Sequence, residues 1–269
     1  MADVSLKKLL EISLEAGREI LDVYEKGIEV ETKEDNSPLT QADQRSHQSI
    51  MKELQEVYAD IPVLSEEGAE IPFTERKNWK QFFLVDPLDG TKEFIKKNGE
   101  FTVNIALIDG KYPVMGVIYA PILDTFYYGQ EGLGAFKLKN ASETAIADDQ
   151  DLMSKSVRLP ETAESTVVNV VASRSHMSAE TEEFIEELHK DYEVDVVSAG
   201  SSLKFCLVAE GKADYYPRYA PTMEWDTGAG QAIVEAAGGK VLRHEDNKRF
   251  YYNRENLKNG WFLAERREE

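Results

Sequence analysis

Apolar side chains near the start of the chain recur every three or four positions, which is the spacing of one helical face. The pattern predicts an amphipathic helix over residues 5–25 and a second one over residues 41–58. Turn-forming residues between the two stretches separate them. In the second helix, Ile50, Leu54 and Val57 fall on the apolar side and are expected to face the core.

Short apolar runs then replace the helical pattern, and β-branched and aromatic residues become frequent, as is typical of strands. The turns between these runs are short, for example at residues 109–113, so we expect antiparallel hairpins. The first half should therefore hold an antiparallel sheet. The predicted strands are PVLS, FFLVD, FTVNIALI, YPVMGVIYAP, DTFYYG and GAFKLK.

The chain becomes polar between residues 139 and 165, and we place a boundary there. The predicted parts are an N-terminal α+β half, residues 1–150, and a C-terminal α/β half, residues 151–269. Beyond the boundary, strands and helices alternate, which predicts a mixed α/β arrangement. The predicted order is VVNVVAS, a helix over residues 178–190, VDVVS, a helix over SLKFCLVAEG, ADYYP, a helix over TGAGQAIVEAAGG, and KVLRH.

Composition narrows the class of protein. The 269 residues are 42% hydrophobic, which is typical of a globular enzyme. The single cysteine, Cys206, excludes an internal disulfide and fits a reducing compartment, where we expect a buried thiol. The chain has no apolar run near 18 residues and no signal-peptide pattern, so we expect a cytoplasmic protein. Peripheral contact with the inner face of the cell membrane is left open.

The net charge of −19 changes the picture of possible partners. Such a surface repels nucleic acid polymers and anionic membranes at long range. A small anionic ligand is still compatible with it if metal ions or a local basic cluster reverse the field. A salt-rich habitat is an alternative cause of the acidity.

Acidic residues gather at the ends of predicted elements. Clustered carboxylates need neutralisation, and hard divalent cations provide it with oxygen ligands alone. The four histidines are scattered and never at metal-binding spacing, so Mg²⁺ is the favoured ion. The acids are Asp43, Glu66, Glu67, Asp86, Asp89 and Asp226.

The spacing of residues in DPLDGT, residues 86–91, is understandable if this stretch binds metal and phosphate. Pro87 is expected to end the strand, so that the two aspartates and the carbonyl of Leu88 converge on one or two ions. Gly90 would let an anion approach the backbone, and a helix starting at Thr91 would point its amides at that anion.

Each acid also has an ordinary structural interpretation. The aspartates of DPLDGT could be turn residues, and Asp226 could cap the helix that follows it. Asp43 could be an acid in the first turn of a helix, and Glu66 and Glu67 could be solvated. The metal-site interpretation depends on all of them occurring together.

Two motifs together resemble a known family. DPLDGT and WDTGAG…AAGG, with SEE before them, resemble the inositol monophosphatase-like superfamily of Mg²⁺-dependent, lithium-sensitive phosphatases. The resemblance covers nearly the whole chain and implies a layered αβαβα sandwich of the sugar-phosphatase type. Further stretches resemble one branch, the 3'(2'),5'-bisphosphate nucleotidases of the CysQ type. These are DNSPLTQAD, PVLSEE, VDPLDGTKEFIKKNGEFTVNIALI, SRSH, GSSLKFCLVAEG and YPRYAPTMEWDT.

The resemblance assigns roles to matching positions. It implies that Thr91 and Asp43 activate water, with Glu67 beside them, and that Gly90, Thr91 and Asp226 contact the substrate. It also implies two or three Mg²⁺ ions. Their expected ligands are Glu66, Asp86, Asp89, Asp226 and the carbonyl of Leu88.

A nucleotide with two phosphates needs a second anion site, which a protein of charge −19 must build from a local basic patch. Gly200 precedes a predicted helix that Ser201 and Ser202 open, and Lys204 lies in its first turn. The alternative is that Lys204 is solvated and Arg218 forms a surface ion pair. The candidates for the second phosphate are Arg174, His176, Gly200, Ser201, Ser202, Lys204 and Arg218.

The expected function is that of a Mg²⁺-dependent phosphatase converting adenosine 3',5'-bisphosphate to AMP and phosphate with metal-activated water. One alternative is an inositol-phosphate or sugar-phosphate phosphatase of the same superfamily. A second alternative is a non-catalytic module that binds nucleotide or metal. Intact Thr91 and Asp43 argue against the module, because binding alone needs no water-activating pair.

Overall fold

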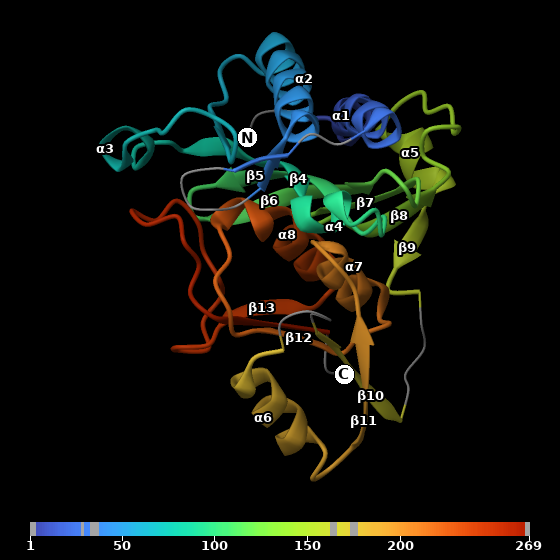
Figure 1. Cartoon of the computed structure of the whole chain (residues 1–269), viewed down its shortest axis with the longest axis vertical. Coiled ribbons are helices and arrows are strands. Elements are labelled where there is room, and N and C mark those ends of the chain that lie inside the picture. The colour runs from blue at the N-terminus through green and yellow to red at the C-terminus, as the bar shows by residue number, and fades with distance from the viewer. Residues whose placement is uncertain (1–3, 28–29, 33–37, 162–165, 173–176, 267–269) are drawn as a thin grey trace.

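The computed structural model describes residues 4–27, 30–32, 38–161, 166–172 and 177–266. The elements form five layers, alternately helices and sheets, from the N-terminal helices to α6, Ala179–Leu188 (Figure 1). The expected αβαβα sandwich is therefore confirmed.

The outer layer consists of α1, Leu6–Lys26, and α2, Gln41–Val57, which pack against each other and on the first sheet (Figure 1). Their apolar faces join the core, and Ile50 and Leu54 are at most 1% exposed. The prediction for Val57 is wrong: it is 47% exposed, because α2 ends at this residue and its side chain lies beyond the packed turns. A two-stranded ladder, β1 (Val30–Thr32) and β2 (Pro38–Thr40), precedes α2.

The first sheet has seven strands in the order β3-β4-β5-β6-β7-β8-β9. The β3–β4 pair is parallel, and every other neighbouring pair is antiparallel. The prediction of an antiparallel first half is thus confirmed apart from one edge pair. The strands are β3 Val63–Ser65, β4 Gln81–Asp89, β5 Thr102–Asp109, β6 Tyr112–Ala120, β7 Thr125–Gln130, β8 Gly134–Lys139 and β9 Val157–Leu159.

Both faces of this sheet are covered, which explains the continuous apolar runs in its strands. In β4, Phe83 and Val85 face the core below α1 and α2, whereas Phe82 and Leu84 face the opposite core. That second core contains α7, Leu203–Glu210, and α8, Gly228–Ala236, which lie between the two sheets (Figure 1).

The second sheet has five strands in the order β11-β10-β12-β14-β13, with parallel and antiparallel pairs. The mixed α/β second half is therefore confirmed, although β14 had no predicted counterpart. Helix α6 packs on its outer side (Figure 1). The strands are β10 Val167–Ala172, β11 Glu193–Ser198, β12 Tyr215–Arg218, β13 Lys240–Arg243 and β14 Phe262–Glu265.

The polar stretch after β8 contains α5, Asp149–Lys155, and then β9, which pairs with β8. The chain reaches the second sheet only after β9, and the division near residue 150 stays a prediction. The thiol of Cys206 is buried, as expected. In the described ranges, no helix combines the length and the apolar character needed to span a bilayer.

Candidate active site

A β-bulge places the two aspartates of DPLDGT on one face of the first sheet. Asp86 pairs with Asn104 of β5, and Asp89 pairs with Thr102. An advance of three residues along β4 is therefore matched by an advance of two residues along β5. Because side chains alternate in a strand, an uninterrupted ladder would point residues three apart to opposite faces. The extra residue brings both carboxylates to the same side.

The prediction that Pro87 ends the strand is wrong, because β4 continues through it to Asp89. Pro87 lies within the bulge, where the ladder is interrupted and its missing N–H costs no hydrogen bond. Its carbonyl instead accepts a hydrogen bond of 2.7 Å from the hydroxyl of Ser46 in α2.

Gly90 makes the turn from β4 into a short helix, α4, which begins at Thr91 as expected and ends at Ile95. Its φ of +92° is in the left-handed region that favours glycine. A Cβ at this position would lie 3.1 Å from the Cβ of Ser201. The backbone conformation therefore favours glycine, and the close packing against the second half of the chain leaves little room for a Cβ.

Asp43 connects α2 to the threonine of the motif. One carboxylate oxygen accepts hydrogen bonds from the amide and hydroxyl of Thr40, at 2.8 and 2.7 Å, in a capping box. The other oxygen accepts a hydrogen bond of 3.1 Å from the hydroxyl of Thr91. Asp43 is thus both a helix-capping acid and the partner of Thr91. Burial raises its pKa, and the nearby negative charge of Glu67 raises it further.

Four acids from three segments approach one another here. Asp86 is 1% exposed, and burial raises its pKa well above the usual value, helped by Glu66, Asp89 and Asp226. Burial likewise raises the pKa of Asp226, with Asp89 and Glu66 adding to the effect. Like charges this close repel strongly unless a cation lies between them. The oxygen-only donor set and its negative charge fit a hard divalent ion.

In the described part of the chain, no three His, Cys, Asp or Glu side chains are arranged as a complete metal-binding group. Two of the acids are turned to backbone amides instead. Asp86 accepts from the amide of Leu88 at 3.1 Å, and Asp226 accepts from the amide of Met223 at 2.8 Å. Asp226 lies in the 3₁₀ turn η1, Glu224–Asp226, and the cap of α8 is the next residue, Thr227.

The turn before α7 packs directly on the first sheet. The hydroxyl of Ser201 donates to the carbonyl of Asp89 at 2.8 Å, and that of Ser202 donates to its carboxylate at 2.6 Å. Ser202 also donates to the carbonyl of Asp226 at 3.1 Å. A Cβ on Gly200 would lie 2.9 Å from atoms of Glu93 and Glu100. Both serine side chains therefore hold Asp89, a contact that the sequence did not predict.

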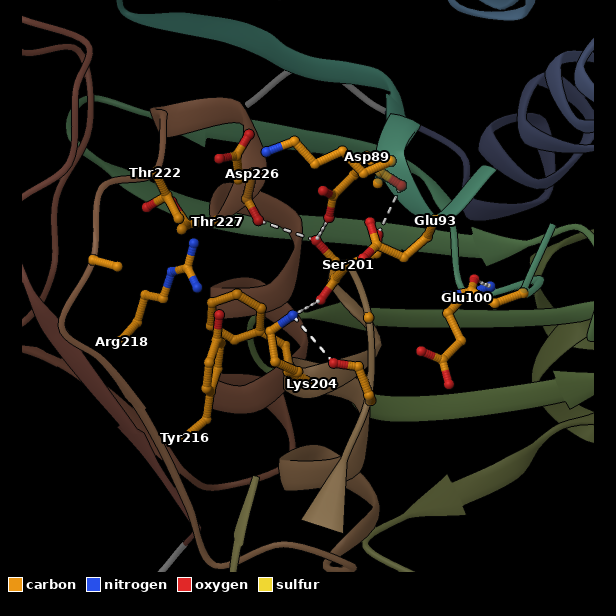
Figure 2. Close-up of a pocket in the computed structure, with 18 of the residues that line it drawn as sticks. Asp89, Glu93, Glu100, Ser201, Lys204, Tyr216, Arg218, Thr222, Asp226 and Thr227 are labelled. Atoms are coloured by element: carbon orange, nitrogen blue, oxygen red, sulfur yellow. Dashed lines mark hydrogen bonds between the residues drawn. The ribbon is translucent and has the colours of Figure 1, made fainter. Parts of the chain in front are cut away.

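A cavity of about 410 Å³ extends from Asp89 and Asp226. Figure 2 shows these two aspartates at one end and Lys204 and Arg218 further along, with Tyr216 beside the lysine. The helix α7 begins at Leu203, and Ser202 is its cap. The cavity thus brings together the metal-site candidates Asp89 and Asp226 and several candidates for the second phosphate. Those candidates are Gly200, Ser201, Ser202, Lys204 and Arg218.

Lys204 is buried, not solvated, at 7% exposure. Its ammonium donates to the carbonyl of Ser201 at 2.8 Å and that of Ala199 at 3.5 Å. Burial lowers its pKa to about 8, although Asp89 favours the charged form. Arg218 donates to the carbonyl of Pro221 at 3.3 Å. The candidates Arg174 and His176 lie outside the described residues.

Two buried polar residues near the site, Asn104 and Glu224, were not among the predicted site residues. Asn104 is a polar residue in the apolar run FTVNIALI, and its amide donates to Ser202 at 2.9 Å and to Asp89 at 3.4 Å. Glu224, two residues before Asp226, is fully buried. A lone polar residue in a buried strand needs a partner, so Asn104 could have been singled out.

The comparisons with known proteins agree with this geometry. The chain is 43% identical over 262 residues to the 3'(2'),5'-bisphosphate nucleotidase CysQ of Escherichia coli K12, covering 96% of this chain and 98% of that protein. It is 35% identical to the CysQ protein of Haemophilus influenzae, covering 96% and 91%.

Solved structures have the same fold. The crystal structure of CysQ from Bacteroides thetaiotaomicron matches with a TM-score of 0.89 and 45% identity, covering 100% of both chains. An inositol monophosphatase of Thermotoga maritima matches with a TM-score of 0.71 at 22% identity, covering 97% of this chain and 91% of that one. The sequence pattern of the inositol monophosphatase family matches residues 3–267. The chain therefore belongs to the inositol monophosphatase family.

Proposed function

We propose that this protein is a Mg²⁺-dependent phosphatase that removes the 3'-phosphate of adenosine 3',5'-bisphosphate and releases AMP and phosphate. The observation that carries the proposal is one cavity with carboxylates at one end and, at the other, buried Lys204 and half-buried Arg218. A substrate with two phosphates matches this division of charge. The relatives named 3'(2'),5'-bisphosphate nucleotidase support the same substrate class.

Two or three Mg²⁺ ions would be held by carboxylates and one carbonyl, all hard oxygen donors. When bound, the ions would neutralise the acids, make water more acidic and stabilise charge on the phosphoryl group. The residues proposed to hold them are Glu66, Asp86, Asp89, Asp226 and the carbonyl of Leu88.

The hydroxyl of Thr91 orients the attacking water, and Asp43 fixes that hydroxyl through the 3.1 Å hydrogen bond. Asp43 is itself held by Thr40, so the oxygen facing Thr91 has a defined position. Glu67 adds negative charge beside this pair, which favours accepting a proton. The amides of Gly90 and Thr91 bind phosphoryl oxygens, and positioning supplies most of the acceleration.

The second phosphate binds at Lys204 and Arg218. An ammonium has three donors, and two of them contact the carbonyls of Ser201 and Ala199, so the third remains for a phosphate oxygen. The buried Nε of Arg218 has no hydrogen-bond partner among the described residues and is available to the same anion. Gly200, Ser201 and Ser202 shape this site through the backbone, and Arg174 and His176 stay candidates.

The test compares Mg²⁺-dependent phosphate release from adenosine 3',5'-bisphosphate, AMP and inositol 1-phosphate. We expect the bisphosphate to be preferred, and Lys204→Ala to lower its kcat/KM by about 10- to 150-fold, because a hydrogen bond to a charged group contributes roughly 1.5–3 kcal/mol. A slow monophosphate should be nearly unaffected.

Lys96→Ala is the matched control, since Lys96 lines the same cavity but is exposed. Its effect should stay within about threefold, as for other exposed charges. Equal losses on both substrates in Lys204→Ala would refute the second-phosphate site. Preference for inositol 1-phosphate would favour the sugar-phosphate alternative, and absence of any hydrolysis would favour a binding module.

A further inference from the structure

A buried carboxylate holds the turn that carries Asp226. Glu224 is 0% exposed and lies two residues earlier in η1. One of its oxygens accepts a hydrogen bond of 2.8 Å from the amide of Asn253. The other accepts from the amide and the guanidinium of Arg254, both at 3.0 Å. The turn is therefore tied to the segment around residue 254 by three hydrogen bonds to one charged group.

That segment contains no helix or long strand, and an arginine from the first half of the chain holds it. Arg76 ends the short helix α3, Phe73–Arg76, and is 2% exposed. Its guanidinium donates to the side chain of Asn253 at 2.9 Å and to the carbonyls of Arg254 and Glu255 at 2.5 and 2.8 Å. In return, the side chain of Asn253 donates to the carbonyl of Arg76 at 2.7 Å.

A third side chain closes the other side of the turn. The amide of Asn259 donates to the hydroxyl of Thr222 at 2.9 Å and to the carbonyl of Met223 at 2.6 Å. Met223 in turn donates its own amide to the carboxylate of Asp226. The contacts thus continue from α3 through the 253–259 segment to the oxygen atoms of Asp226.

We propose that Arg76 and Glu224 are positioning residues that fix the carboxylate of Asp226 opposite the aspartates of β4. The inference rests on the proposed metal site. Asp226 comes from the second half of the chain, whereas Asp86 and Asp89 are fixed by the first sheet. A planar guanidinium with five donors in a fixed fork can join three acceptors at once, and a lysine cannot reproduce that geometry.

Mg²⁺ affinity, measured by isothermal titration calorimetry without substrate, provides the test. Residues that orient metal ligands typically change affinity by 10- to 100-fold when replaced. We expect Glu224→Gln to weaken Mg²⁺ binding by about tenfold or more. Arg76→Lys keeps the positive charge but loses the forked guanidinium, so it should weaken Mg²⁺ binding by a smaller factor. It is the second test variant if Glu224→Gln does not fold.

Glu210→Gln is the matched control. Glu210 is also buried and paired with a cation, Lys137 at 2.9 Å, but its partners lie away from the cavity. It should lose thermal stability and keep its Mg²⁺ affinity within twofold. If Glu224→Gln and Arg76→Lys both kept normal Mg²⁺ affinity, or if Glu210→Gln weakened it equally, the positioning role would be wrong. A wild-type protein that bound no Mg²⁺ would instead refute the proposed metal site.

Discussion

Asp86 and Glu210 are equally buried, each 1% exposed, but their surroundings have opposite charge. Asp86 faces other acids, and burial together with Glu66, Asp89 and Asp226 raises its pKa. Burial also acts to raise the pKa of Glu210, at the end of α7, but hydrogen bonds from Lys137, Lys212 and Tyr127 hold that pKa below its usual value.

The difference separates a buried charge that stabilises the fold from one that we propose to have a role in catalysis. We call Glu210, Tyr127, Lys137, Glu161 and Lys212 the Glu210 cluster. It joins α7 to β7 and β8, with Tyr127 donating to Glu210 at 2.8 Å and Lys137 at 2.9 Å, and its two lysines balance its two glutamates. Neighbouring acids instead raise the pKa of Asp86 and of Asp226, and this repulsion opposes folding unless a cation neutralises it. Buried groups that cost stability without compensation are concentrated at functional sites.

The largest effect on activity is expected from Asp89→Asn. It keeps the size of the side chain but removes a charge that we propose to hold Mg²⁺, so turnover should fall by about 10²- to 10³-fold or more. The fold should survive, because the substitution relieves repulsion. Steady-state assays and thermal unfolding in metal-free buffer measure the two quantities. Near wild-type turnover at saturating Mg²⁺ would contradict the assignment of this region.

Thr91→Ala should lower kcat by about 10²-fold, because general acid–base groups contribute roughly 10²- to 10⁴-fold. The Mg²⁺ concentration for half-maximal rate should change little, since the hydroxyl donates at 3.1 Å to Asp43 and only at 3.5 Å to the carbonyl of Leu88. Thr91→Ser, which keeps a hydroxyl, is the control and should recover most of the rate. A change in KM alone would move Thr91 from water activation to substrate binding.

The pH profile gives a smaller effect that isolates Lys204, whose pKa is about 8. Asp89, Glu93 and Glu100 favour its charged form, Arg218 opposes it, and the ring of Tyr216 lies 5.6 Å away. Because the proposed site needs the ammonium, kcat/KM for the bisphosphate should fall as pH rises above 8, by up to about tenfold per unit. A monophosphate without the second anion should show no such fall.

The same shift has a consequence for stability. The folded protein releases this proton near pH 8, whereas the unfolded chain keeps it up to the ordinary value of 10.5. The unfolded state therefore binds more protons between these values, and the contribution of Lys204 to stability rises with pH there. In Lys204→Met, chemical denaturation at pH 8 and 10 should no longer show this contribution. An unchanged pH dependence in the variant would assign it to another group.

The smallest effect on activity is expected from Glu210→Gln, which perturbs the balanced cluster. Removing one partner of a buried ion pair costs about 3–5 kcal/mol, and the low end applies because Lys137 also pairs with Glu161. Denaturant unfolding should show this loss, while kcat/KM stays within twofold. A large loss of activity at full folding would show that the comparison between the two regions is wrong.

Much of this architecture follows from local pattern. The strands β4 to β8 are long apolar runs with short turns, and α1 and α2 have clear helical spacing, so their existence was predictable. The strands β9 and β14 had no predicted counterpart, and their pairing with neighbouring strands of the sheets defines them. The end of β4 was not predictable, because a proline usually ends a strand, whereas here a bulge accommodates Pro87.

The site was predictable where the chain itself brings groups together and not where distant segments meet. The spacing of Asp86 and Asp89 is visible in the sequence, and so is Thr91 just after them. Three hydrogen bonds of the Arg76 guanidinium reach residues 177 to 179 positions away, two of them to backbone carbonyls that no side-chain pattern reveals. Its surroundings in the sequence, TERKNW, are polar and resemble a solvated loop.

The bulge in β4 makes DPLDGT sensitive to length rather than to composition. Exchanging Leu88 for another apolar residue preserves the count of residues between the aspartates, so the backbone path is retained. Losing one codon there would restore regular pairing with β5 and leave the aspartates, then two residues apart, on one face, but it would remove the bulge and with it a backbone carbonyl between them. Insertions and deletions, which surface loops absorb easily, are thus the changes that evolution must exclude from this strand, even where substitutions are neutral.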